Sequence, residues 1–198
     1  MAGNRCAAQP LEYANLDFMR AQCMQPIETT AEGGEVFAGK ACDEIERDRG
    51  EAGCARFADR NGFEAVWTPE RHFHAFGGLY PNPAVASAAI AAITERVQIR
   101  AGSCVSPLHS PIRIAEDWAL VDNLSKGRVG ISFAAGWQPN DFVLAPQNFA
   151  NRKQRMFDDI KSVQALWRGD TVPFPGHDGK AVAVRTLPRP IQKTLPTW

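Results

Sequence analysis

From about residue 52 to the end of the chain, apolar residues follow helical and strand-like spacings in turn. Apolar positions three and four apart predict helices, and short uncharged apolar runs predict strands that are buried on both faces. The predicted elements, in chain order, are a helix over 52–60, a strand over 63–68, a helix over 82–94, a strand over 97–105, a helix that begins at 110–111 and ends at "SKGR" (125–128), a strand over 129–135, a helix over 151–167, and a hairpin formed by 172–174 and 181–185.

Capping residues mark the ends of these predicted helices. Asn61 and Gly62 end the first helix, and Gly169 closes the last. Asn82–Pro83 and Ser110–Pro111 each provide a cap followed by a first-turn proline. The helix after Ser110 is expected to turn these residues inward: Ile112, Ala115, Trp118, Ala119, and either Leu120 or Val121.

The predicted strands recur at a constant interval. Their equivalent positions Val66, Ile99 and Ile131 are 33 and 32 residues apart, which matches one unit of an eight-fold β/α barrel of about 250 residues. A doubly wound open sheet has a similar rhythm, but the glycine-rich dinucleotide fingerprint is missing after the first strand. We therefore predict an α/β fold of the (β/α)8 TIM-barrel type, with about half of the barrel visible.

Two domains are expected along the chain. Residues 1–51 contain no clear strand run, and their turn formers and charges are scattered. We expect this segment to be poorly ordered or loosely helical. Residues 52–198 are expected to form the partial barrel domain.

Composition narrows the class of protein only a little. The 22 basic and 22 acidic residues cancel, so neither nucleic acid nor an anionic membrane surface is indicated as a partner. No apolar run approaches the roughly 20 residues of a spanning helix, and a cytoplasmic protein is the default expectation. The five cysteines form no C-x-x-C pair, which favours reduced thiols over disulfides or a zinc site.

Polar and special residues cluster where three predicted strands end: Trp67–His74, Gly102–His109 and Ala134–Asp141. Because the carboxyl ends of parallel strands meet at one face of a barrel, these segments should converge. Glu70, Arg71 and His72 then fall where reactive groups are expected. A solvated surface pair and an ordinary loop histidine are the alternative interpretation of these residues.

Other chemistries fit the sequence less well. His72 and His74 are two apart and could share a metal, with His109 as a third ligand, but no carboxylate or cysteine keeps a recognisable spacing, so no metal is predicted. Neither Ser103 nor Ser106 lies in the G-x-S-x-G turn of a serine nucleophile. The small residues of "AGS" and "AAG" leave room for a planar ligand against the strand ends, although tight core packing explains them too.

Three stretches together resemble the luciferase-like, flavin-dependent monooxygenases, in particular the branch associated with polyketide and nonribosomal peptide assembly lines. They are "ARFADRNGFEAVWTPERHFHAFGGLYPNPAV", "VQIRAGSCVSPLHSPIRIAEDWALVDNLSKGRVGISFAAGWQPNDF" and "RTLPRPIQ". The resemblance covers about residues 53–198 and implies a barrel that takes reduced FMN from a separate flavin reductase. Oxygen would then give a C4a-hydroperoxide in a site that excludes water.

The resemblance also implies roles for single residues. Glu70 would lie near the flavin, and His72 would donate or accept a proton. Bacterial luciferases have histidine where this chain has Arg71, so Arg71 is expected to stabilise peroxide or substrate charge. The residues expected to contact the flavin are Trp67, Gly102, Ser103, Ala134, Ala135, Gly136 and Trp137, with a cis peptide between Gly102 and Ser103.

The partners and the alternatives follow from the same resemblance. The substrate would be a small or carrier-bound organic molecule of a biosynthetic pathway, and full-length relatives would be homodimers. Relatives begin with a hydrophobic strand that residues 1–50 do not show, and they continue into later phosphate-binding loops, which implies weakened flavin affinity here. Two alternatives remain: an inactive remnant or subunit-association module, and an oxidoreductase that uses the deazaflavin F420.

Overall fold

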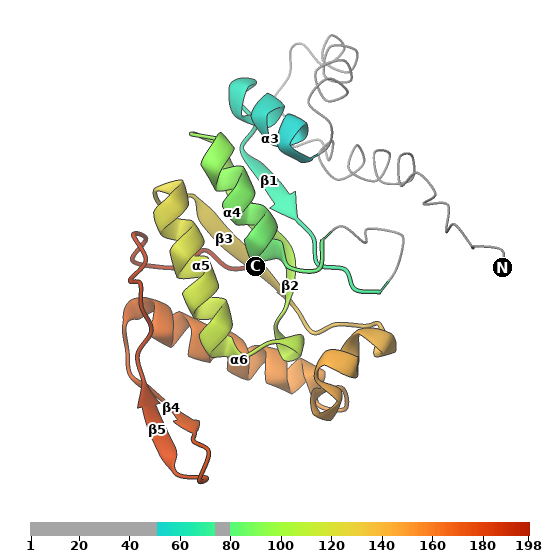
Figure 1. Ribbon diagram of the computed structural model, residues 1–198, viewed down its shortest axis with the longest axis vertical. Coiled ribbons are helices and arrows are strands. Elements are labelled where there is room, and N and C mark those ends of the chain that lie inside the picture. Colours follow the sequence, from blue (N-terminus) through green and yellow to red (C-terminus); the bar gives the residue numbers. More distant parts are fainter. Residues whose placement is uncertain (1–50, 74–79) are drawn as a thin grey trace, which may run out of the picture.

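A computed structural model describes residues 51–73 and 80–198 of the chain (Figure 1). The N-terminal segment 1–50 lies outside the described residues, so the expectation for its order stays a prediction. His74, one of the two histidines considered as a metal pair, also lies outside them.

Every predicted helix and strand is present, and its bounds differ from the predicted ones by no more than two residues. Three short 3-10 helices, which the sequence did not indicate, lie in the connections. The elements are α3 (Glu51–Arg60), β1 (Ala65–Thr68), α4 (Pro83–Ile93), β2 (Gln98–Val105), η1 (Ser106–Leu108), α5 (Pro111–Ser125), β3 (Val129–Ala134), η2 (Pro139–Leu144), η3 (Pro146–Asn148), α6 (Arg152–Arg168), β4 (Val172–Pro175) and β5 (Ala181–Val184).

Local signals account for most of these bounds. The Asn82 side chain accepts hydrogen bonds from the backbone N of Ala84 and Val85 at the start of α4. Gly62 and Gly169, with φ of +76° and +94°, leave the helical region after α3 and α6. Ser110 precedes α5 as predicted, but its side chain makes no capping hydrogen bond.

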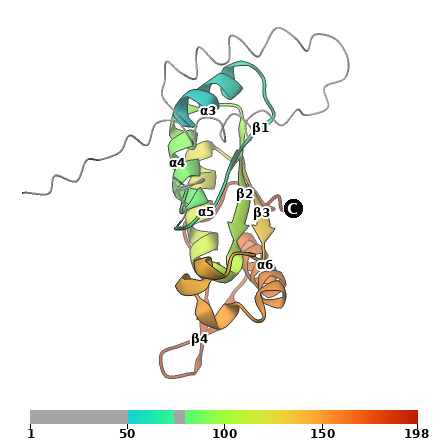
Figure 2. The same cartoon turned by 90° about the vertical axis from the view of Figure 1, so that its right-hand side faces the viewer.

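The three parallel strands form one sheet in the order β1-β2-β3. Their register pairs Val66 with Ile99, and Ala101 with Ile131. Each strand is followed by a helix, and α4 and α5 lie on one face of the sheet (Figure 2). The described residues are therefore three consecutive β/α units of the barrel type, as the constant interval predicted. The antiparallel β4–β5 hairpin extends from this body (Figure 1).

The core lies between the sheet and the helices. Ile99, Ala101 and Ile131 are completely buried, and the Thr68 hydroxyl lies 2.9 Å from that of Ser87 on α4. On α5, Val121 is buried whereas Leu120 is half exposed, so the structure selects Val121 as the inward residue.

The opposite face of the sheet carries aromatic rings around an arginine. Because side chains alternate along a strand, Trp67 points away from the helix layer that Thr68 contacts. The Arg100 guanidinium lies 5.4 Å from the Trp67 ring and 4.8 Å from that of Trp198. Trp198 reaches this face because Pro196–Trp198 runs parallel beside β3, with Ile131 N donating to Pro196 O at 2.9 Å.

Charged side chains stabilise the end of the sheet where the three strands begin. Asp59 accepts the backbone N–H groups of Glu95, Arg96 and Val97 just before β2. Arg128, just before β3, donates to the backbone oxygens of Thr94, Val97 and Ser125, and Asp122 accepts the N–H groups of Ile191 and Gln192. These side chains are bound almost entirely to backbone.

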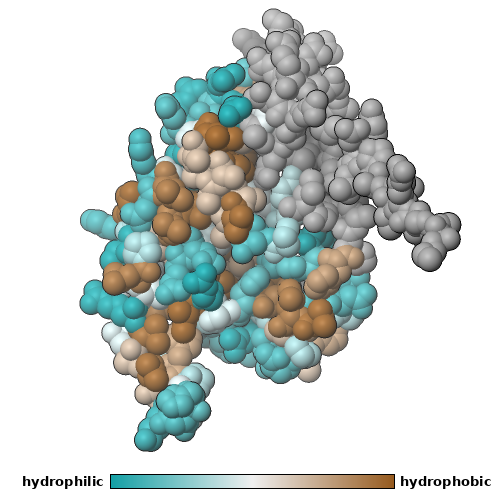
Figure 3. All heavy atoms as spheres, viewed as in Figure 1, coloured by the Kyte–Doolittle hydropathy of each residue, from teal (hydrophilic) through white to brown (hydrophobic). Residues whose placement is uncertain are grey.

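The surface shows no large apolar area on the face in Figure 3, where apolar side chains stand in separate groups between hydrophilic ones. Among the described residues, no helix is both long and apolar enough to cross a bilayer. Cys54 and Cys104 are buried in the core, and the expectation of reduced thiols stays a prediction.

Candidate active site

The end of β1 places a buried carboxylate at the centre of the site. Glu70 follows β1 by two residues, and its Oε1 accepts from His72 Nε2 at 2.9 Å and His109 Nε2 at 2.6 Å. Its Oε2 accepts from the backbone N of Val105 at the end of β2 at 2.7 Å. Two strand ends are thus joined through one side chain, as their predicted convergence requires.

The Glu70 carboxylate lies in the interior of the site, and its expected place near the flavin stays a prediction. Its side chain is fully buried, with no exposed area, whereas His72 retains 8%. The carboxylate turns inward because three N–H donors meet there, and a buried carboxylate is stable only when it is hydrogen-bonded. Glu70 therefore positions other residues and does not itself line an open surface.

Glu70 and His109 perturb each other's ionisation. Burial alone would raise the pKa of Glu70, but the hydrogen bonds from His109 and His72 outweigh it, and the pKa is lowered. Burial alone would lower the pKa of His109, yet the hydrogen bond and charge of Glu70 outweigh it, and the pKa is raised. The pair therefore favours an ionised carboxylate beside a cationic imidazole.

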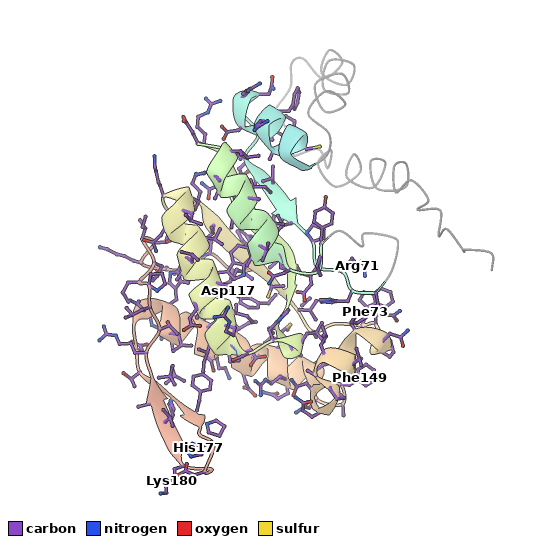
Figure 4. All side chains as sticks on the ribbon, in the orientation of Figure 1. Arg71, Phe73, Asp117, Phe149, His177 and Lys180 are labelled. Atoms are coloured by element: carbon purple, nitrogen blue, oxygen red, sulfur yellow. The ribbon has the colours of Figure 1, made fainter. Side chains whose placement is uncertain are left out.

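The ends of β1 and β3 meet through an arginine and a tryptophan. The Arg71 guanidinium lies 5.5 Å from the centre of the Trp137 ring, within range of a cation–π contact. Arg71 N also donates to Tyr80 O at 2.9 Å. Figure 4 labels Arg71, which follows β1. Trp137 is 69% exposed, so its ring stands at the open side of the site and not in the core.

Small residues line the strand ends next to these groups. The peptide between Gly102 and Ser103 is cis, which confirms the prediction for that bond. A Cβ at Gly102 would lie 2.8 Å from the Trp67 ring, and one at Gly136 would lie 2.9 Å from Phe142 and Val105. Glycine is therefore required at both positions, because Trp67 at the first, and Phe142 with Val105 at the second, already fill the space that a side chain would take.

The remaining predicted contact residues, Ser103, Ala134 and Ala135, are half-buried at the same ends. Arg152 at the start of α6 donates to Gly136 O at 3.1 Å and so helps to position the third strand end. Small residues at the ends of neighbouring strands are compatible with a flat ring system such as a flavin, and their contact with one stays a prediction.

The contact of His109 with Glu70 is the main feature of this site that the sequence reasoning missed, because His109 was considered only as a third metal ligand. His109 ends the η1 turn after β2, where its backbone N donates to Ser106 O at 3.0 Å. Its position in the "SPLHSP" segment, at the end of a predicted strand, was the available signal. Only the folded chain brings it to Glu70, 39 residues away.

A thiol completes a cluster of polar atoms at this point. Ligand atoms of Glu70, Cys104 and His109 lie within 4.8 Å of one another. Both oxygens of Glu70 already accept hydrogen bonds, and burial, with the nearby Glu70 charge, raises the pKa of Cys104 well above its ordinary value. A neutral thiol is a weak metal ligand, so the cluster requires no ion. The absence of a metal site stays a prediction.

Comparison with known proteins identifies relatives of this arrangement. The model of the luciferase-like monooxygenase family matches residues 34–198. The oxygenase component of the flavin-dependent trigonelline monooxygenase from Acinetobacter baylyi is 30% identical over 143 residues, which cover 71% of this chain and 39% of that protein. An alkanal monooxygenase alpha chain from Photorhabdus laumondii is 37% identical over 87 residues, 44% of this chain and 24% of that one.

Solved structures agree with this. The monooxygenase RslO1 from Streptomyces bottropensis superposes with a TM-score of 0.66 at 30% identity, covering 79% of this chain and 46% of its own. The oxygenating constituent of 3,6-diketocamphane monooxygenase from Pseudomonas putida, solved with FMN, shares the fold at 16% identity with a TM-score of 0.63, covering 73% and 43%. The chain thus spans less than half the length of these relatives. With its parallel β/α units and the family pattern over most of its length, the chain belongs to the luciferase-like monooxygenase family.

Proposed function

We propose that this chain forms the flavin-facing part of an FMN-dependent monooxygenase that oxidises an organic substrate of a biosynthetic pathway. The observation that carries the proposal is the meeting of three strand ends: Glu70 binds His109, and Arg71 lies against Trp137. The relatives named as flavin-dependent oxygenases support the same chemistry. The name "oxygenase component" also supports a separate flavin reductase as partner.

Each group has a distinct proposed role. The surface from Trp67 through Gly102 and Ser103 to Ala134, Ala135 and Gly136 would hold the isoalloxazine ring, with Trp137 closing it from the open side. Bound reduced flavin supplies the electrons that activate dioxygen. Closing this surface excludes water, which otherwise competes for reactive species.

Proton transfer is assigned to His72. Its Nε2 is bound to Glu70 Oε1, which orients the ring and leaves Nδ1 for exchange with a reacting oxygen. Arg71 supplies a fixed positive charge that stabilises negative charge developing on oxygen or on the substrate. Glu70 acts through the histidines, because its own oxygens are buried and occupied.

The test is to add reduced FMN to the purified chain without oxygen, admit oxygen, and follow the return of oxidised flavin absorbance. We expect reoxidation slower than that of free flavin, with oxygen transferred to added substrate. Reoxidation at the free-flavin rate refutes the proposal for this chain. Reduced F420 is assayed in parallel, because an F420-dependent secondary alcohol dehydrogenase shares the fold at 22% identity and a TM-score of 0.59.

A variant pair separates catalysis from folding. His72→Gln removes the imidazole ring and is expected to lower coupled turnover about 100-fold, the size of a typical acid–base contribution. His177→Gln is the matched control, because His177 is exposed at the tip of the β4–β5 hairpin, far from the strand ends (Figure 4). Equal turnover in both variants removes His72 from the mechanism.

A further inference from the structure

The Glu70 carboxylate closes the turn that follows β2. Its Oε2 accepts from Val105 N at 2.7 Å, and its Oε1 accepts from His109 Nε2 at 2.6 Å. Val105 is the last residue of β2, and His109 follows the η1 turn, where its backbone N donates to Ser106 O. One buried side chain from the end of β1 therefore binds both ends of the segment 105–109.

This contact lies just beyond an irregularity in β2. The register with β3 shifts between Gly102 and Cys104, so that Ser103 has no paired residue on β3. Such a bulge redirects the residues around it, and bulges are common beside active sites. The pairing of β1 with β2 stops at Ala101, before the bulge. On the β1 side, the Glu70 carboxylate therefore takes the place of a strand partner for β2 after the bulge.

His109 provides a positive charge that balances this carboxylate. The Glu70 side chain has no exposed area, and a buried carboxylate is stable only when it is hydrogen-bonded and paired. Burial alone would lower the pKa of His109, but the hydrogen bond and charge of Glu70 outweigh it, and the pKa is raised. The stabilisation from such a group is present below its unfolded pKa and is lost as pH rises through the folded one. The neutral ring can still donate its N–H, but a neutral hydrogen bond is roughly half as strong as a charged one.

Charged and titratable groups face His109 from each element packed around it. They are Glu70 and His72 after β1, Cys104 on β2, Arg113 and Asp117 on α5, and Asp159 with Arg155 on α6. Asp117 is paired with Arg113 at 2.9 Å, and Asp159 with Arg155 at 2.8 Å. Glu70, at 2.6 Å, binds the His109 ring directly, so the charge of His109 acts first on the Glu70 carboxylate.

We propose that His109 is a positioning residue whose charged contact with Glu70 holds β2 at the Ser103 bulge in the arrangement that binds the flavin, so that the cofactor binds less tightly once His109 is neutral. The inference rests on the proposed function for the roles of Gly102 and Ser103. His109 acts through Glu70 and Val105 and does not itself contact the cofactor. Flavin affinity thereby depends on pH in the range where histidines titrate.

The first experiment needs no flavin. In the full chain, the His109 ring and the Val105 backbone amide are followed by NMR from about pH 5 to about pH 9, the range in which histidines change charge. We expect both signals to move with one midpoint, because the amide reports the bond to Glu70 Oε2. In His109→Gln, which keeps an N–H donor but cannot become charged, the amide should no longer move at that midpoint. A Val105 amide that ignores His109 in wild type, or moves alike in both proteins, overturns the proposal.

The second experiment measures the dissociation constant of oxidised FMN by the quenching of flavin fluorescence. At about pH 6, wild type should bind about fivefold to tenfold more tightly than His109→Gln, and at about pH 9 the two should bind alike, because the contact is then neutral in both. His109→Lys carries a cation that persists at about pH 9, so its affinity should fall less than that of wild type. Comparing the proteins at equal pH cancels the ionisation of the flavin itself.

The outcomes separate this inference from the proposed function. A merely structural role of His109 would lower the stability of His109→Gln without a pH-dependent difference in FMN affinity. His177→Gln, on the exposed hairpin, is the control and should bind FMN as wild type does at every pH. Equal affinity of wild type and His109→Gln at about pH 6 overturns the inference and leaves the proposed function standing. A chain that binds no FMN, yet whose Val105 amide follows His109, supports the contact with β2 and overturns the proposed function.

Discussion

Charged side chains lie both where the strands of the sheet begin and where they end, but they are bound to different partners at the two ends. Where the strands begin, Asp59, Arg128 and Asp122 are bound mainly to backbone atoms. Where the strands end, Glu70 is bound to two imidazoles. Backbone groups do not titrate, so the contacts where the strands begin persist at all ordinary pH values. The charge of the histidine–carboxylate cluster where the strands end changes near neutrality. The amino ends of the strands therefore form the stabilising end of the sheet, and the carboxyl ends form its reactive end, as in barrel enzymes generally.

The pKa of Asp59 shows how contacts with backbone stabilise the end of the sheet where the strands begin. Burial alone would raise the pKa of this carboxyl, but the N–H groups of Val97, Arg96 and Glu95 outweigh it and lower the pKa. A lowered carboxyl pKa means that its stabilisation is present above the unfolded value and is lost only as pH falls through the folded one. Asp59 therefore contributes throughout the neutral range in which the histidines titrate.

The largest effect is expected from removing the Arg128 guanidinium, which binds backbone oxygens where the strands begin. Arg128→Met leaves the oxygens of Thr94, Val97 and Ser125 without their donor, and we expect the free energy of unfolding to fall by about 3 to 5 kcal/mol. Urea denaturation measures the loss. Arg128→Lys, which keeps the charge but not the planar donors, should lose less. A loss below about 1 kcal/mol in Arg128→Met would contradict the assignment.

The next prediction tests whether a buried carboxyl group on the reactive side of the sheet lowers the stability of the fold as pH rises. Asp159 on α6 pairs with Arg155 at 2.8 Å, and burial raises its pKa to about 6. A raised carboxyl pKa means that the native state holds the proton more tightly, so stability falls as pH rises from about 4 through about 6. The cost at neutral pH is about 3 kcal/mol for a group this buried.

Asp159→Asn should remove that cost. The variant is expected to gain on wild type by up to about 3 kcal/mol between about pH 4 and about pH 7. Glu70 and His109 titrate in both proteins, so the difference between the two stability curves isolates Asp159. Parallel curves would mean that the Arg155 pair fully offsets the burial.

The smallest effect is the difference in stability loss between two glycines, one before a strand begins and one after a strand ends. Gly62, before β1, and Gly136, after β3, both have φ of +76°, but only Gly136 has side chains within 3 Å of a built Cβ. Gly62→Ala should lose about 1 to 2 kcal/mol from backbone strain alone. Gly136→Ala should lose about 2 to 4 kcal/mol, because overpacking adds to the same strain. Thermal unfolding of the two variants checks the difference. Equal losses would show that the loop at Gly136 shifts to make room for the added methyl group.

Much of the fold could be predicted from the chain alone, because its elements are marked by local chemistry. Asn82 with Pro83 begins α4, and Gly169 ends α6, through interactions within a few residues. The constant interval between strands then indicated parallel units, since a strand that feeds a helix packs back onto the same sheet in one way. The resemblance to flavin-dependent monooxygenases also located the cis peptide at Gly102.

What only the tertiary structure decided is which polar groups meet. Glu70 and His109 are 39 positions apart, and nothing local shows that His72 and His109 would bind the same oxygen of a fully buried Glu70 carboxylate. The choice of Val121 over Leu120 on α5 is of the same kind. Hydrogen bonds between side chains depend on directions set by several packed elements at once, whereas caps and periodicity depend on the chain next to them. The sequence by itself therefore determined the elements and their order, and the packing of β1, β2 and α5 decided the site.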